Sequence, residues 1–191
     1  ERGARVRLIE GAELPTGWFG KPCACVQGYR EARGDLLLFT DADTRHAPEL
    51  LCRAVGALES QRRDLVTVIG RMICGSFWER VIMPVIGALL AIRFHPTVVN
   101  RARRASEAIA NGQFILVTRE SYEAVGTHAA VKHEVAEDLA MAQLYFRAGR
   151  PQLFAFGLRL LGTRMYTGLA GLVEGWSKNV YVGGRRSYPD E

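Results

Sequence analysis

Short apolar runs alternate with amphipathic segments along the first 70 residues of the chain. Apolar runs bounded by turn residues predict strands, and longer segments with helical spacing predict helices. In chain order the expected elements are a short strand at 6–9, a helix over 23–33, a strand over 36–39 covered on both faces, a helix over 48–60 and a buried strand over 65–69. This alternation predicts an α/β domain.

The second half of the chain continues this pattern less regularly. Strands are expected over 113–118 and, around Gly157, over 153–161, and helices over 134–148 and 169–182. The sequence contains no internal repeat and no low-complexity stretch. We therefore expect one domain over residues 1–191.

Residues 77–94 are apolar around almost the whole circumference of a helix. The run is shorter than the ~20 residues that span a bilayer, so we expect that it does not cross a membrane unaided. Three arginines follow it, at Arg101, Arg103 and Arg104. An apolar helix with a basic flank is typical of a segment at an anionic lipid surface, and 77–104 is the candidate. A buried helix followed by a solvated basic loop is an equally good alternative.

Composition narrows the class of protein. The 191 residues are 48% hydrophobic and 24% charged, with a formal net charge of +5, which excludes a disordered tail and a small disulfide-stapled module. Arginine supplies most of the basic excess and suits phosphate, carboxylate or anionic lipid partners. The four cysteines lack zinc-finger spacing, and we expect reduced, buried thiols in a cytosolic setting. The first residues lack the pattern of a secretory signal and are typical of mid-domain sequence.

Two carboxylates, Asp41 and Asp43, follow the apolar run 36–39. Open α/β folds bind ligands at the carboxyl ends of their strands. Hard divalent cations prefer oxygen ligands and often lie between a carboxylate and a substrate diphosphate. The pair therefore indicates a Mg²⁺ or Mn²⁺ site for a phosphorylated substrate. The alternative is a polar turn in which Asp41 caps the following backbone.

Other polar groups are weaker signals when taken singly. Glu137 and Asp138 fall near the start of a predicted helix, where acidic residues also complement the helix dipole. Lys21 follows a glycine-containing loop at 17–20 and is a candidate phosphate clamp, although the full P-loop pattern is absent. The motif Asn111-Gly112-Gln113 is a turn signature and, secondarily, a hydrogen-bonding site.

A C-terminal group gathers cations, an aromatic ring and amide donors. Arg164-Met165-Tyr166 and Gly175-Trp176-Ser177-Lys178-Asn179 together have the groups that hold a diphosphate. A surface helix with snorkelling basic side chains is the alternative. The four histidines show no metal-ligand spacing, and we expect ordinary loop residues at His46, His95, His128 and His133.

In this order the motifs resemble the family 2 glycosyltransferases, inverting enzymes with the GT-A fold, over about residues 6–182. Asp41-Ala42-Asp43 is similar to that family's DxD motif, and Glu137-Asp138 to its ED motif. Residues 164–166 and 175–179 occupy the place of its (Q/R)xxRW element. The set is most similar to the membrane-associated group that includes carotenoid and hopanoid-associated glycosyltransferases. A Rossmann-like mixed central sheet with flanking helices is the fold that this implies.

The resemblance implies roles on the donor side. Asp41 and Asp43 would hold the divalent metal and the ribose and diphosphate of the donor, with Asp43 the more direct metal ligand. Lys21 would lie near the nucleotide. The residues that would close over the diphosphate and acceptor are Arg164, Trp176 and Lys178.

On the acceptor side, the resemblance implies that Asp138 is the general base and that Glu137 shapes its surroundings. Asn111, Gly112 and Gln113 would contact the acceptor. The implied partners are a nucleotide-diphosphate sugar, a lipid, polyisoprenoid or saccharide acceptor and a membrane surface, and no nucleic acid.

The family also implies regions outside this chain. Its nucleobase-binding strands would mostly precede residue 1, and its membrane helices would follow the last motif. The expected location is the cytoplasmic face of the cell membrane, in an integral membrane protein when full length.

Two other classes of function stay open. A Leu-rich strand before Asp-x-Asp also occurs in HAD-like phosphatases, but there a Thr or Val stands two places after the second Asp, where this chain has Arg45. A non-catalytic module that binds a lipid surface through 77–104 is the second alternative.

Overall fold

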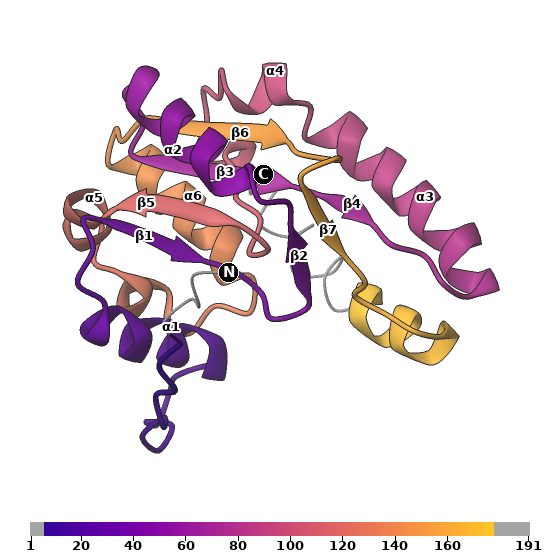
Figure 1. Cartoon of the computed structure of the whole chain (residues 1–191), viewed down its shortest axis with the longest axis horizontal. Coiled ribbons are helices and arrows are strands. Elements are labelled where there is room, and N and C mark those ends of the chain that lie inside the picture. The colour runs from indigo at the N-terminus through magenta and orange to yellow at the C-terminus, as the bar shows by residue number, and fades with distance from the viewer. Residues whose placement is uncertain (1–5, 178–191) are drawn as a thin grey trace.

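A mixed four-stranded sheet forms the centre of the molecule, which the computed structural model describes over residues 6–177. In spatial order the strands are β1 (Leu36–Phe39), β5 (Ile115–Thr118), β3 (Leu65–Ile69) and β6 (Gln152–Phe156) (Figure 1). β5 is antiparallel to both of its neighbours, and β3 is parallel to β6. The carboxyl ends of β1, β3 and β6 therefore lie at the same edge as the start of β5.

Helices cover both faces of this sheet. On one face, α2 (Leu50–Ser60) shares an apolar cluster with Val66 and Leu116. On the other, α6 (Glu137–Arg147) shares a second cluster with Val117. Neighbouring residues of β5 thus face different helices, as the pleat of a strand requires. The predicted α/β class, with a mixed central sheet and flanking helices, is confirmed.

A second, three-stranded sheet lies beside the first. Its order is β2 (Thr44–His46), β7 (Leu161–Thr163) and β4 (Arg71–Met72), with β7 antiparallel to β2 and parallel to β4. The remaining elements are α1 (Gly20–Glu31), α3 (Phe77–Arg93), α4 (Pro96–Val99), η1 (Ala105–Glu107), α5 (Arg119–Ala124) and η2 (His128–Val131), and residues 169–177 are also helical.

α3 begins at a capping box and extends along the outside of the molecule (Figure 1). Ser76 accepts a hydrogen bond from the backbone N–H of Glu79, whose carboxylate accepts one from the N–H of Ser76. Past its end, Phe94 and Val99 pack on Phe154 of β6. Most of the helix surface between these two anchors faces solvent.

α3 by itself has 17 residues, in keeping with the expected short apolar segment, but together with α4 the segment is long and apolar enough to cross a membrane by length and composition alone. Taken as one helical segment, Phe77–Val99 has 23 residues and a mean hydropathy of 1.7. Only 11% of its most apolar window is buried within the protein, so it is not a core helix.

Several other expectations need correction. No strand forms at 6–9, where the chain is exposed coil, because no neighbouring strand lies alongside to pair with it. β1 is an edge strand in the described sheet and only Leu37 in it is buried, so the run is not covered on both faces. All four cysteines are free, but of these only Cys23 is buried.

Two histidines also differ from the expectation of loop residues, and the first, His46, is the last residue of β2. His128 is 3% exposed, and its Nδ1 lies 2.7 Å from the hydroxyl of Tyr122. Burial, with a smaller contribution from the charge of Lys21, lowers the pKa of His128 to about 4. The neutral ring is therefore part of the core beneath β1 and not a loop residue.

Truncation of the central strand tests this packing. We expect Leu116→Ala to lower the free energy of unfolding by about 2–5 kcal/mol, because Leu116 is 1% exposed and a cavity would remain. Urea denaturation measures this loss. The matched control is Leu51→Ala on α2, where the side chain is 49% exposed and little change is expected. Equal losses in the two variants would contradict the assigned core.

Candidate active site

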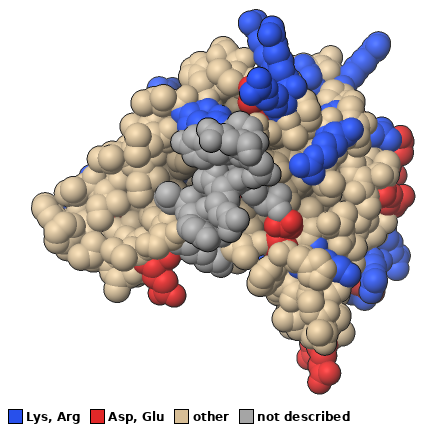
Figure 2. All heavy atoms as spheres, turned by 180° about the vertical axis from the view of Figure 1, so that it is seen from behind, with Lys and Arg blue, Asp and Glu red and all other residues tan. Residues whose placement is uncertain are grey.

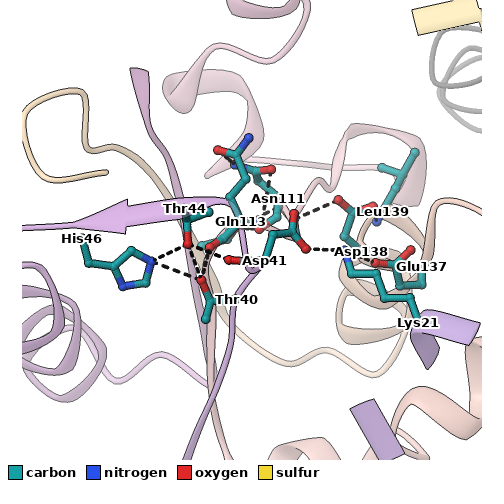
Figure 3. A network of polar contacts seen from close by, with 12 residues as sticks. Lys21, Thr40, Asp41, Thr44, His46, Asn111, Gln113, Glu137, Asp138 and Leu139 are labelled. Carbon is teal, nitrogen blue, oxygen red and sulfur yellow. Dashed lines mark hydrogen bonds and ion pairs between the residues drawn. The ribbon is translucent and has the colours of Figure 1, made fainter. Parts of the chain in front are cut away.

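Three elements bring charged side chains together at the edge where β1 ends and β5 begins (Figure 3). Lys21 lies in the first turn of α1, Asp41 directly after β1, and Glu137 and Asp138 in the first turn of α6. The turn at 111–113 leads into β5 at the same edge. We call Lys21, Asp41, Glu137 and Asp138 the charged cluster.

Lys21 is at the centre of this cluster. Its Nζ lies 2.7 Å from Oδ1 of Asp41 and 2.7 Å from Oε1 of Glu137. The side chain of Glu137 is 7% exposed, whereas those of Lys21 and Asp41 are 47% and 32% exposed. One cation thus balances a buried carboxylate on α6 and a half-buried one at the end of β1.

Burial and charge oppose each other in the pKa values of this pair. Burial raises the pKa of Glu137, the neighbouring charge of Asp138 raises it further, and Lys21 lowers it, with a net rise. Burial by itself would lower the pKa of Lys21, but the charge of Glu137 and the contacts with Asp41 outweigh it, so that the net shift is upward. Lys21 is therefore a permanent cation in this site.

Backbone N–H groups orient Asp138. Oδ2 accepts a hydrogen bond of 2.9 Å from the N–H of Gly112, and Oδ1 accepts one of 2.7 Å from the N–H of Leu139. Each carboxylate oxygen can accept a second hydrogen bond, so both stay available to a ligand.

Gly112 has no room for a side chain. A Cβ built there would lie 2.7 Å from Nζ of Lys21, 3.4 Å from Oδ2 of Asp138 and 3.6 Å from Oδ2 of Asp41. The space above this glycine is therefore where the charged groups converge.

The 111–113 motif is a turn fixed by its own side chains. The N–H of Phe114 donates to the carbonyl of Asn111, whose Nδ2 donates to the carbonyl of Val68 and to Oε1 of Gln113. Gln113 is 8% exposed. These contacts hold the backbone of Gly112 toward Asp138.

A second polar network adjoins Asp41 (Figure 3). The hydroxyls of Thr40 and Thr44 lie 3.0 Å apart, and each lies 3.1 Å from Nε2 of His46. Thr40 also donates to the carbonyl of Gln113 and Thr44 to that of Asp41. Sequence reasoning missed Thr40 and treated His46 as an ordinary loop residue. The i, i+2 spacing of Thr44 and His46, which places both on one face of a strand, is a signal that could have linked these two residues.

Asp43 lies apart from the charged cluster. It is exposed, its carbonyl accepts a hydrogen bond from Thr163, and its charge adds to the effect of burial in raising the pKa of Tyr166. Within residues 6–177, no group of three His, Cys, Asp or Glu side chains is arranged to hold a metal ion. Mg²⁺ in phosphate-transfer sites is commonly bound by one or two carboxylates plus substrate phosphates, and the exposed carboxylate of Asp43 fits that requirement.

Arg164 and Trp176 contact α3. Arg164 forms a two-pronged ion pair with Glu79, with both N···O distances 3.1 Å, and Nε1 of Trp176 lies 3.2 Å from Sδ of Met83. Hydrogen bonds from Arg164 and from the backbone at Gly75 and Ser76 hold the pKa of Glu79 at about 2. Lys178 lies outside the described residues.

Sequence reasoning did not single out Glu79 as a site residue, although it is 1% exposed and neutralises Arg164. The Ser76-x-x-Glu79 spacing is a capping-box signal that could have drawn attention to Glu79. No pattern along the chain indicated the contact with Arg164.

A mixed sheet with helices on both faces and acidic pairs at its ligand-binding edge defines the class of glycosyltransferases that the motifs resemble. The family model for glycosyl transferase family 21 matches residues 2–154, and the chain belongs to that family. The motifs resemble the family 2 glycosyltransferases, whereas the family model that matches the chain is that of glycosyl transferase family 21. Both are families of glycosyltransferases.

Curated relatives of this chain include two glycosyltransferases from staphylococci. The 4,4'-diaponeurosporenoate glycosyltransferase of Staphylococcus aureus (strain MRSA252) is 28% identical over 183 residues, covering 90% of this chain and 46% of the relative. That of Staphylococcus haemolyticus (strain JCSC1435) is 23% identical over 199 residues, covering 99% and 51%. The chain spans about half the length of these relatives.

Solved structures similar to this chain include a glucosyl-3-phosphoglycerate synthase and a mannosyl-3-phosphoglycerate synthase. Glucosyl-3-phosphoglycerate synthase from Mycobacterium tuberculosis, in complex with phosphoglyceric acid, has a TM-score of 0.49 and 19% identity, covering 97% of this chain and 58% of the other. Mannosyl-3-phosphoglycerate synthase from Rubrobacter xylanophilus has a TM-score of 0.45 and 19% identity, covering 90% and 54%.

Removal of the central cation tests the charge balance of the cluster. We expect Lys21→Met to lower the free energy of unfolding at neutral pH by about 1–3 kcal/mol, because the buried carboxylate of Glu137 loses its counter-charge. The half-exposed position of Lys21 places the loss toward the lower end, since water replaces part of the interaction. Burial already raises the pKa of Glu137, so acidification protonates this carboxyl group and the deficit shrinks as the pH falls.

Chemical denaturation of the variant and the unmodified protein at neutral and at acidic pH measures this deficit. The control is the double variant Lys21→Met/Glu137→Gln, in which no buried charge is left and most of the loss at neutral pH is recovered. A deficit that is the same at both pH values, or unchanged by Glu137→Gln, would exclude the ion pair as its cause.

Proposed function

We propose that the protein, as a single catalytic domain over this chain, transfers a sugar from a nucleotide-diphosphate sugar to a hydroxyl group with inversion at the anomeric carbon. The observation that carries the proposal is the convergence of Asp138, Lys21 and Asp41 around Gly112 at the carboxyl edge of the sheet. Membership of family 21 supports the same class of reaction.

Asp138 is the proposed general base. A single displacement needs a base that removes the proton of the acceptor hydroxyl while the diphosphate departs from the opposite side of the sugar. The hydrogen bonds from the N–H groups of Gly112 and Leu139 fix the Asp138 carboxylate. Each carboxylate oxygen keeps a lone pair that can accept the proton. Glu137 is buried and forms an ion pair with Lys21, and this contact holds the start of α6 in place. In this proposal it is a positioning residue.

Asp41 and Asp43 serve the donor. Asp41 forms an ion pair with Lys21, and we assign Asp41 to the ribose and diphosphate of the donor. Lys21 is proposed to lie near the nucleotide. Asp43 is the better placed of the two to hold Mg²⁺ or Mn²⁺, because no described ion pair occupies its carboxylate. When bound, the metal supplies electrostatic stabilisation of the leaving diphosphate.

Arg164 and Trp176 are proposed to close over the diphosphate and acceptor, together with Lys178. In this structure the guanidinium of Arg164 is bound by Glu79. Phosphate oxygens accept the same two-pronged hydrogen bonds as a carboxylate. Arg164 is therefore proposed to contact the donor by exchanging the carboxylate of Glu79 for the donor diphosphate.

The acceptor is proposed to lie against the turn at 111–113, which faces Asp138. The name of the staphylococcal relatives gives 4,4'-diaponeurosporenoate as their acceptor, and this supports a lipid or polyisoprenoid acceptor over a saccharide. The family match gives no support to the phosphatase alternative, in which Asp41 would be a nucleophile.

Variants of the two acidic pairs test the division of labour. We expect Asp138→Asn to reduce the transfer rate by about 10²- to 10⁴-fold, because the base is lost, and to leave donor affinity nearly unchanged. Asp43→Ala is expected to weaken metal-dependent binding of the donor. Transfer is measured with a radiolabelled nucleotide-sugar, and donor affinity by titration calorimetry. Loss of donor binding in Asp138→Asn, or full transfer in both variants, would refute the assignment.

We also propose that α3 lies on the cytoplasmic face of an anionic membrane. Its outer side carries a row of exposed apolar side chains at helical spacing, including Val81, Val85, Leu89 and Ile92, with exposed fractions from 47% to 79%. Figure 2 shows the tapering end of the molecule formed by α3 almost free of charge on this side. Arginines follow at 101, 103 and 104 and attract anionic headgroups.

The inner side of α3 is held by the protein through Glu79 and Met83. A helix held in this way is proposed to rest in the membrane interface and not to cross the bilayer. Glu79 and Met83 contact Arg164 and Trp176, the residues that are proposed to close over the acceptor. A lipid acceptor at α3 is therefore proposed to reach the site without leaving the membrane surface.

An acidic substitution on the outer side tests the membrane contact. We expect Leu89→Glu to lower binding to anionic vesicles at least about tenfold. A leucine side chain buried in the membrane contributes about 1.5–3 kcal/mol to binding, and a negative charge at this position opposes insertion. Vesicle sedimentation measures the partition. The matched control is Leu51→Glu on α2, an exposed leucine outside α3. Equal binding of both variants would count against this face.

A further inference from the structure

A pocket of about 210 Å³ lies over the second sheet, at a place to which the proposed reaction assigns no role. Its lining includes three arginines from three different segments, which are Arg45 on β2, Arg71 on β4 and Arg159 in the turn between β6 and β7. We call it the arginine pocket. Gly162 lies between the first two.

The strand register explains why these side chains share one face. Gly162 of β7 pairs with Arg45 on one side and with Arg71 on the other. Paired residues of neighbouring strands point to the same face of a sheet, so both arginines flank a position that has no side chain. Arg71 leans over that position, with its Nε 3.6 Å from where a Cβ of Gly162 would lie.

The charge of the pocket is unbalanced. No acidic side chain lines it, and within residues 6–177 none of its three arginines takes part in a described ion pair. Arg164, by contrast, has Glu79 as its partner. Arg45 and Arg71 carry like charges on the two strands that flank β7, and a bound anion offsets the repulsion between them.

The arginine pocket adjoins the polar network beside the candidate active site, because His46 belongs to that network and also lines the pocket. Thr44 and His46, which alternate with Arg45 along β2, have their polar contacts with Thr40. Thr163, the neighbour of Gly162, is buried and donates to the carbonyl of Asp43. A ligand in the arginine pocket therefore lies next to the network of Thr40, Thr44 and His46, and the strands beneath it continue to Asp43.

We propose that the arginine pocket binds a phosphate monoester, with the guanidinium groups of Arg45, Arg71 and Arg159 around its oxygens. Guanidinium forks form two parallel hydrogen bonds to phosphate, and Arg71 extends over Gly162 beside the side chain of Ile73. The phosphate belongs either to a soluble phosphorylated molecule or to a lipid headgroup, because both present the same oxygens. The proposal does not depend on the transfer reaction.

Binding of inorganic phosphate to the purified protein, by titration calorimetry at constant ionic strength, tests the site. We expect Arg71→Gln and Arg45→Gln each to weaken phosphate affinity at least about tenfold, since charge-assisted hydrogen bonds are lost. The matched control is Arg33→Gln, an exposed arginine beyond α1 that changes the net charge equally.

Vesicles separate the two sources. Sedimentation with phosphatidic acid vesicles that is reduced in Arg71→Gln and unchanged in Arg33→Gln assigns the phosphate to a lipid. A defect of Arg71→Gln with inorganic phosphate alone assigns it to a soluble ligand. Equal behaviour of Arg71→Gln and Arg33→Gln toward both probes, or no binding of either probe by the unmodified protein, would overturn the proposal.

Discussion

The buried carboxylate of Glu137 is the constraint on which the candidate active site depends. A carboxylate with 7% of its side chain exposed loses most of its hydration and needs a cation against it. Lys21 supplies that cation from a helix far away in the sequence, and its remaining hydrogen-bonding capacity goes to Asp41. One ammonium group thus holds α1, the end of β1 and the start of α6 at a common point, and the position of Asp138 follows from that of its neighbour.

The parts of this arrangement that local sequence determines were predictable. The buried strand 65–69 matches β3 because a continuous apolar run between polar boundaries has few other solutions. The helices expected over 23–33 and 134–148 are present as α1 and α6, with ends displaced by a few residues. The DxD and ED pairs were recognisable as motifs for the same reason, since their spacing lies within single elements.

What depends on distant contacts was not predictable from the pattern. Nothing near Lys21 in the sequence indicates that its partner is Glu137, and nothing near Glu79 indicates Arg164. The run at 36–39 is apolar enough for a central strand, yet the described sheet leaves β1 at its edge. His128 was taken for a loop residue because the pattern along the chain does not show the hydroxyl of Tyr122 that accommodates it.

Gly112 contributes to the candidate active site through its backbone alone. The N–H that orients Asp138 is present in every residue except proline, but a Cβ at position 112 would meet Nζ of Lys21, so even alanine there displaces the central cation. The side chains of Asn111 and Gln113 hold this turn, so their replacement removes contacts that fix the backbone of Gly112. An engineer who wishes to change the acceptor therefore has to look beyond residues 111–113, because the same three residues orient the base.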